Sequence, residues 1–178
     1  MPDGEENKML QLRPYRGQDD FICIKSWIKD RRTHALWCAD LLPYPVTSDA
    51  LEKVLEKGKR LWGDRAYVFT DDAGKQIGFL VFSVQENEKV SFVKLVLLDD
   101  ARRGQGYGTK MMKLLLEYLF RNTDVLTVRL NVFHENTQAK KCYEKAGFIE
   151  LQTVPGAFSL KNEVWGRCLM AAERKSGL

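Results

Sequence analysis

The segment that most constrains this chain spans residues 96–110, where an apolar strand runs into a glycine-rich turn and then directly into a helical pattern. Glycine lets the backbone turn tightly and leaves successive N–H groups uncovered by side chains. Those donors, added to the positive end of the helix dipole, predict a site for phosphate oxygens. The residues of this turn are Gly104, Gly106 and Gly108, with Arg102, Arg103 and Lys110 adding positive charge beside them.

The turn does not match the two common nucleotide-binding loops. No Gly-Lys-Ser/Thr run follows Gly104, as the Walker loop requires, and Thr109 stands where the dinucleotide fingerprint needs its third glycine. A glycine-rich strand-to-helix turn that binds nothing is the plain alternative for this segment taken alone.

Hydrophobic periodicity predicts one strand, three helices, three strands, and then helix, strand, helix and two strands. The expected strands are 8–13, 66–70, 76–85, 89–98, 125–133, 148–153 and 164–171. The expected helices are 18–29 capped by Asp19 or Asp20, 33–39, one capped by Thr47 or Ser48 and ending near 57, one from the glycine turn to about 121, and 137–146. This order predicts an α/β (α+β) domain with a mixed sheet.

Length and charge narrow the class of protein. A chain of 178 residues favours one domain, 1–178, with an ordered part from about 8 to 173. Between Lys94 and Gly147 ten basic residues face six acidic ones, which accounts for the whole net charge of +4. This segment lacks interleaved aromatic residues, so we expect no nucleic-acid partner.

The chain carries no pattern of a membrane or metal-binding protein. Its first residues are polar and acidic, and its apolar runs are too short to cross a bilayer, so we expect a cytoplasmic protein with no membrane partner. The four cysteines are widely spaced, which predicts free thiols and no metal site.

Two motifs together resemble the GNAT superfamily of N-acetyltransferases. Arg103-x-x-Gly106-x-Gly108 is similar to the family's pyrophosphate-binding signature. About thirty residues later, Val132-x-x-x-Asn136-x-x-Ala139-x-x-x-Tyr143-x-x-x-Gly147-Phe148 is similar to its second motif. The resemblance covers about 79–148. It implies a single-domain, bacterial-type fold with a mixed, mostly antiparallel sheet of six to seven strands, flanked by helices and containing a splayed pair of parallel strands.

The resemblance also implies roles for particular residues. Backbone groups at Val96 and Leu98 would contact the pantetheine arm of acetyl-CoA, and Asn131 and Asn136 would flank it. Tyr143 would donate a proton to the departing thiolate. The pyrophosphate would be held by Arg103, Gly104, Gln105, Gly106, Tyr107, Gly108 and Thr109. Asp100 departs from the proline that is frequent in the family.

Each of these side chains has a plainer alternative. Tyr143 could only pack on its helix, and Asn136 is also a good helix cap. Lys140 and Lys141 could reach the 3′-phosphate or form a solvated helix face, and His134 is expected to be a surface loop residue.

The general base is left open by the sequence. The strand before the glycine turn contains no acid, so the base could be Glu88, Asp40, a bound water or none.

The implied function is transfer of an acetyl group from acetyl-CoA to a primary amine, without a metal, in a monomer or homodimer. A non-catalytic acyl-CoA-binding module on the same fold is the alternative. The mildly basic segment 16–60 counts against a polyamine or aminoglycoside acceptor, while Arg31 and Arg32 could bind a carboxylate or be solvated. The aromatic residues of the acceptor side (Trp27, Trp37, Tyr44, Trp62 and Trp165) could form a pocket, but we expect most of them in the core.

Overall fold

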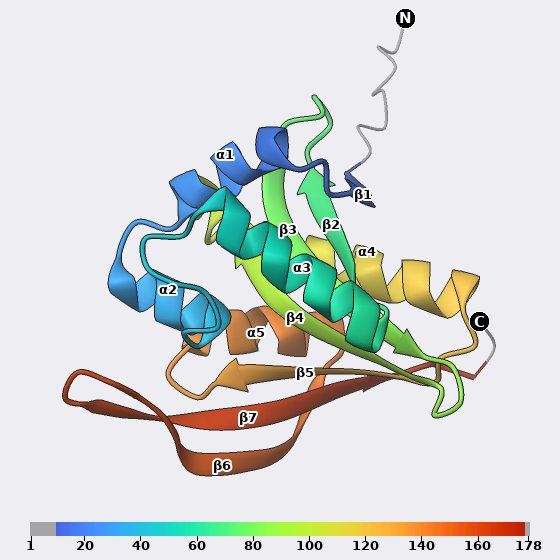
Figure 1. Ribbon diagram of the computed structural model, residues 1–178. Helices are drawn as coiled ribbons and strands as arrows, with labels where there is room; N and C mark the ends of the chain where they lie inside the picture. The colour runs from blue at the N-terminus through green and yellow to red at the C-terminus, as the bar shows by residue number, and fades with distance from the viewer. Residues whose placement is uncertain (1–9, 177–178) are drawn as a thin grey trace, which may run out of the picture.

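The computed structural model describes residues 10–176, which form one seven-stranded sheet with helices on both faces (Figure 1). The strands are β1 (Gln11–Pro14), β2 (Arg65–Thr70), β3 (Gln76–Gln85), β4 (Val90–Leu98), β5 (Thr127–Phe133), β6 (Ile149–Leu160) and β7 (Glu163–Glu173). The helices are α1 (Gln18–Trp27), α2 (Arg31–Cys38), α3 (Ser48–Trp62), α4 (Tyr107–Asn122) and α5 (Thr137–Ala146), with a 3₁₀ turn at Asp100–Arg102.

The sheet order is β1-β2-β3-β4-β5-β7-β6, and only the β4–β5 pair is parallel. The predicted element order and the mixed, mostly antiparallel sheet are therefore confirmed. The parallel pair needs a crossover, and the crossover is α4, the helix that the glycine turn opens.

Two layers of helix cover the sheet (Figure 1). Helices α1, α2 and α3 lie over β2, β3 and β4 on one face, which we call the α2 face; here Phe21, Ile24 and Leu51 pack against Leu95 and Leu97. Helices α4 and α5 cover the opposite face, called the α4 face, where Leu115 and Met112 pack on Leu130 and Met170. The part of the α2 face formed by β5, β7 and β6 extends beyond α1 and α3.

Strands β4 and β5 separate at a β-bulge. Their ladder runs from Val90–Thr127 to Val93–Leu130 and then stops. Directly after it, the β3–β4 register shifts, and Leu95 has a positive φ of 52°. Lys94 and Leu95 consequently both face the α2 side, because Lys94 pairs with Asp64 while Leu95 joins the cluster under α1 and α3.

Local sequence signals explain the ends of α4 and α5. Gly106, the residue before α4, has a φ of 81°, a conformation that glycine adopts without strain. Asn136 caps α5 by accepting a hydrogen bond from the Ala139 N–H at 3.3 Å, and Gly147 ends the helix with a φ of 113°. The predicted range 137–146 for α5 is confirmed.

Several predicted boundaries were wrong. Helix α1 ends at Trp27 rather than 29, and neither Asp19 nor Asp20 caps it, because the preceding residue is Gly17 and Asp20 lies buried against Arg13. Helix α2 begins at Arg31, earlier than predicted, because Asp30 caps it through the Thr33 N–H. The predicted Thr47 cap of α3 is confirmed.

The longest differences lie in α3 and β6. Helix α3 continues five residues past the predicted end to Trp62, where Gly63 in the left-handed region terminates it. Strand β6 continues past 153 to Leu160 because Pro155 lies on an edge strand, where a missing N–H is tolerated, and Gly156 lies in a register shift. The first strand begins at Gln11, and the predicted residues Lys8 and Met9 lie outside the described residues.

Candidate active site

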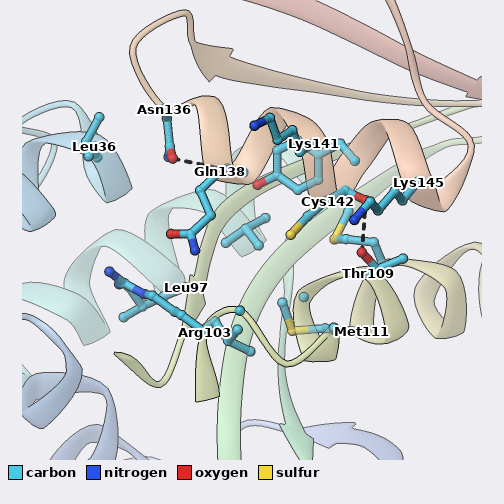
Figure 2. A pocket seen from close by; sticks show the side chains of 18 of the residues that line it. Leu36, Leu97, Arg103, Thr109, Met111, Asn136, Gln138, Lys141, Cys142 and Lys145 are labelled. Atoms are coloured by element: carbon cyan, nitrogen blue, oxygen red, sulfur yellow. Dashed lines mark hydrogen bonds between the residues drawn. The ribbon is translucent and has the colours of Figure 1, made fainter. Parts of the chain in front are cut away.

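A cavity of about 330 Å³ opens where β4 parts from β5 (Figure 2). Four segments form its walls: α2, the end of β4, the glycine turn with the start of α4, and α5. The lining residues from these segments are Thr33, Leu36, Trp37, Val96, Leu97, Leu98, Arg103, Gly104, Gly106, Gly108, Thr109, Met111, Met112, Asn136, Gln138, Ala139, Lys141, Cys142, Tyr143 and Lys145.

The glycine turn presents unoccupied donors to this cavity. Within the described part of the chain, the backbone N–H groups of Gly104, Gly106 and Gly108 donate to no other protein group. Gly104 and Gly106 have φ values of 73° and 81°, and a Cβ added to either would meet nothing within 4 Å. The turn therefore offers open space and free donors at a helix N-terminus, as an anion site requires.

Gly108 serves a different purpose from the two glycines before it. A Cβ atom there would lie 3.2 Å from the Cys142 Sγ atom, so the glycine lets α4 and α5 approach each other. The Thr109 hydroxyl also donates to the Cys142 carbonyl oxygen at 3.4 Å (Figure 2).

The charge of the lining is entirely positive. Arg103, Lys141 and Lys145 contribute cationic side chains, and no Asp, Glu or His of the described residues lines the cavity. Of the two lysines proposed for a phosphate, only Lys141 lies there, because Lys140 pairs with Glu150 at 2.7 Å.

Tyr143 lies on the inner side of α5 and lines the cavity while packing in the core. Its side chain is 7% exposed, and its ring lies 6.0 Å from that of Phe148. Burial raises the pKa of the Tyr143 phenol above its ordinary value. The group is therefore protonated at neutral pH and can act as a proton donor.

The other predicted contacts are divided between the cavity and its surroundings. Val96, Leu98 and Asn136 line it, whereas Asn131 is exposed on β5 just beyond the last β4–β5 rung. Gln105 and Tyr107 are absent from the lining. The Gln105 amide donates to the Ala101 carbonyl, and the Tyr107 ring lies under Arg102 and Lys110.

The structure contradicts both carboxylates suggested as a general base. Asp40 is held by Arg31, whose guanidinium lowers the pKa of the Asp40 carboxyl. Glu88 lies in the turn before Val90, at the opposite end of β4 from the glycine turn. Neither residue lines the cavity.

The wall formed by α2 contains one residue that the sequence suggested for a pocket, Trp37. Thr33, Leu36 and Trp37 line the cavity, and the Trp37 indole Nε1 is buried without a hydrogen-bond partner among residues 10–176. Thr33 and Leu36 carry no sequence signal of a site, so only the structure reveals their part of this wall.

The paired arginines at the start of α2 each bind a carboxylate of the chain itself. Arg31 binds Asp40 at 2.8 Å, and Arg32 binds both oxygens of Glu163 at 2.6 and 2.7 Å. The carboxylate that each of them binds thus comes from the chain itself, and the suggested role toward an acceptor stays a prediction. Among the aromatic residues proposed for a pocket, Trp27, Trp37 and Trp165 are buried, whereas Tyr44 and Trp62 are exposed.

His134 is exposed in the loop after β5, as expected, and the thiols of Cys23, Cys38, Cys142 and Cys168 are free. No group of three or more His, Cys, Asp or Glu side chains within residues 10–176 is arranged to hold a metal ion. Nor does any helix in this range have the length and apolar character needed to cross a membrane.

These features define a site for an anionic ligand at a helix N-terminus, next to the point where two parallel strands part. The Acetyltransferase (GNAT) family matches residues 29–148. The chain belongs to this family, and the resemblance stated from its two motifs is confirmed.

Curated relatives match over a shorter stretch. The aminoglycoside N(6′)-acetyltransferase type 1 of Klebsiella pneumoniae is 37% identical over 59 residues, which are 33% of this chain and 29% of that protein. The kanamycin resistance protein of Rhizobium radiobacter is 38% identical over 58 residues, which are 33% of this chain and 54% of that protein. The match thus spans well under two thirds of either relative.

Solved structures share the fold over nearly the whole chain. Spermidine N-acetyltransferase from Vibrio cholerae, in complex with CoA and spermine, has a TM-score of 0.78 at 20% identity and covers 94% of this chain and 96% of its own. AAC(6′)-Ib in complex with ribostamycin and coenzyme A has a TM-score of 0.73 at 21% identity, with 93% of each chain covered. The predicted fold class is confirmed.

Proposed function

We propose that this protein transfers an acetyl group from acetyl-CoA to a primary amine by direct attack within a ternary complex. One observation carries the proposal: a single cavity brings together the free strand end Val96–Leu98, the donors of the glycine turn and the buried phenol of Tyr143. Family membership supports the same reaction.

The residues present fit acetyl-CoA. The N–H groups of Gly104, Gly106 and Gly108 would hold the pyrophosphate, with Arg103 adding charge, and Lys141 or Lys145 would meet a further phosphate. After the bulge, β4 stays paired with β3 but has no partner among residues 10–176 on the side that faces β5, because the β4–β5 ladder ends at Val93. The backbone on that side can pair with the amides of the pantetheine arm. Asn136 lines the same path.

Acetyl-CoA would supply the acyl thioester, and the chain would supply orientation and a proton. The Tyr143 hydroxyl stays protonated because burial raises its pKa, so it can donate its proton to the sulfur of the leaving thiolate. The attacking amine must be neutral. Since no carboxylate or histidine of the described residues lines the cavity, an amine that is partly neutral at the working pH suits this site best.

We further propose a primary amine as the acceptor and the cytoplasm as the location. The two structural neighbours described above are named for spermidine or were solved with an aminoglycoside; the class that we carry over from them is a primary amine. Four free thiols suit a reducing environment, which supports a cytoplasmic location.

A thiol-release assay over a panel of amines tests the reaction, with CoA binding measured separately by calorimetry. We expect CoA to bind and its release from acetyl-CoA to depend on an amine. If CoA binds but no amine raises thiol release above hydrolysis, the protein is an acyl-CoA-binding module on the same fold, and the proposed function is wrong.

A further inference from the structure

Two arginines on the α2 face of the sheet have no carboxylate partner among residues 10–176. Arg129 lies on β5 and Arg167 on β7. Alternate residues of a strand share a face, so Arg129 points to the same side as Phe133, and Arg167 to the same side as Trp165. Because Phe133 and Trp165 pack with Ala35 of α2, both arginines belong to the α2 face.

One hydrogen-bond donor of the Arg129 side chain, its Nε–H group, lacks a partner within residues 10–176. Its neighbours across the sheet are Phe92 on β4 and Ala171 on β7, neither of which offers a side-chain acceptor. The Arg129 Nε atom is buried without a hydrogen-bond partner within the described part of the chain. A buried donor without a partner costs free energy. Because the Nε atom itself is closed to solvent, a ligand would contact the accessible part of this half-buried residue.

Arg129 does not line the cavity, but it lies on β5 beside the point where β4 and β5 part. It precedes Leu130, the last β5 residue paired with β4, and Asn131 follows on the same face where the strands part. Two residues along a strand span about 6.6 Å. Because α4 and α5 cover the opposite face, an acceptor reaches this gap from the α2 face (Figure 1).

Three carboxylates on the α2 side of the sheet already bind basic side chains of the chain. Asp40 and Glu163 bind the two arginines that begin α2, and Asp64 binds Lys94 at 2.6 Å. A fourth, Glu135 in the loop after β5, accepts the Gly166 N–H at 3.3 Å rather than pairing with a basic side chain.

Neither arginine is therefore paired with a carboxylate of the described residues, so both can bind an anionic ligand. Of the two, Arg129 lies nearer to the gap between β4 and β5. A positive charge at this point repels a polycation and attracts an anion. The planar guanidinium binds a carboxylate through two parallel hydrogen bonds, which gives an acceptor a fixed orientation.

Resting on the acetyl transfer proposed above, we infer that the acceptor is a primary amine that also carries a carboxylate a few bonds from the nitrogen. Arg129 binds this carboxylate, and Arg167 adds charge at the rim. The short spacing between Arg129 and the strand gap favours amino acids and short ω-amino acids over long polyamines.

Matched amines with and without a carboxylate test the inference. We would compare L-phenylalanine with phenethylamine, and γ-aminobutyrate with propylamine, with spermidine as the polycation. We expect kcat/KM to favour the carboxylate member of at least one pair by tenfold or more. Arg129→Gln should raise the KM of that acid about ten- to a hundredfold and bring the ratio within the pair close to one, and Arg129→Lys should restore part of the ratio.

Arg121→Gln, an exposed charge at the end of α4, is the matched control and should keep the ratio. Thermal unfolding of each variant checks that it is folded. The inference is wrong if the neutral amines or spermidine are the better acceptors of the unaltered protein, or if Arg129→Gln keeps the ratio.

A binding measurement separates this inference from the proposed function. L-Phenylalanine and γ-aminobutyrate would be titrated calorimetrically into CoA-loaded protein and into its Arg129→Gln variant. If no amine is acetylated while the acids bind only with Arg129 present, acetyl transfer fails and the carboxylate site stands. If neither acid binds through Arg129, the carboxylate site is refuted whatever the turnover.

Discussion

Gly108 of α4 lies so close to Cys142 of α5 that a Cβ atom on the glycine would come 3.2 Å from the Cys142 Sγ atom. The two helices that line the cavity therefore meet at a residue without a side chain. Any atom added at this contact pushes apart the glycine turn and the helix that carries Tyr143.

Gly108→Ala tests this contact when combined with Cys142→Ala. The added methyl group clashes with sulfur in the natural background, whereas the Cys142 Cβ, at 3.7 Å, is at ordinary distance. We expect Gly108→Ala to cost about 1 kcal/mol more stability in the natural background than in the Cys142→Ala background, measured by urea unfolding of all four proteins. The helix-propensity gain of alanine over glycine is the same in both backgrounds and cancels. Additive effects would show that the helices do not meet as described.

Gly106→Ala separates strain from ligand binding, with Gly74→Ala as its control. The two glycines have φ values of 81° and 79°, and neither has an atom within 4 Å of an added Cβ. Both variants should lose roughly 1–2 kcal/mol of stability, because alanine is strained in the left-handed region. Only Gly106→Ala should weaken CoA binding, by tenfold or more in calorimetry, since Gly74 lies in the β2–β3 turn. Equal CoA affinity in both variants would contradict the phosphate site.

Tyr143→Phe tests the proton donor. Because phenylalanine keeps the ring that packs on Phe148 but lacks the hydroxyl, we expect kcat to fall about a hundredfold or more, while the Kd of CoA changes less than twofold. Tyr118→Phe, on α4 and outside the cavity lining, should leave both constants unchanged. A parallel loss of CoA affinity and kcat would reduce Tyr143 to a packing residue.

His34 should make the stability depend on pH. Its side chain is fully buried, and burial, together with the charge of Arg31, lowers the pKa of the imidazole. The unfolded chain therefore binds a proton at higher pH than the folded protein does, and stability falls as pH drops below about 6.5, with a slope of at most about 1.4 kcal/mol per pH unit.

Melting temperatures between pH 7.5 and 5.5 measure this effect. His34→Gln should flatten the curve, whereas His134→Gln, at an exposed site, should leave its shape unchanged. If the two variants show the same pH dependence, buried His34 is not its source.

The parts of the fold that follow from local chemistry could be predicted. Asn136 and Gly147 delimit α5 because a cap and a left-handed glycine are local requirements, and Gly106 opens α4 for the same reason. The bulge could not be predicted, because Leu95 adopts a positive φ that nothing in an apolar strand signals. Likewise, Pro155-Gly156 is typical of a turn, yet it lies within the edge strand β6.

The glycine-turn and α5 residues of the cavity lining could be predicted, whereas on α2 only Trp37 was suggested. The glycine turn and Tyr143 lie within short motifs, whereas Arg32 and Glu163 are 131 residues apart and meet only through the tertiary fold. That pairing gives Arg32 a carboxylate partner from the chain itself. The sequence does not indicate that Arg129 lacks a partner within residues 10–176, because this depends on its strand register and burial.

A crystal structure of the protein with acetyl-CoA tests the central claim most directly. We expect the pyrophosphate within hydrogen-bond distance of the N–H groups between Gly104 and Thr109, the pantetheine arm along Val96–Leu98, and the thioester sulfur beside the Tyr143 hydroxyl. A ligand bound elsewhere, or one whose thioester lies away from Tyr143 and the gap between β4 and β5, would contradict it.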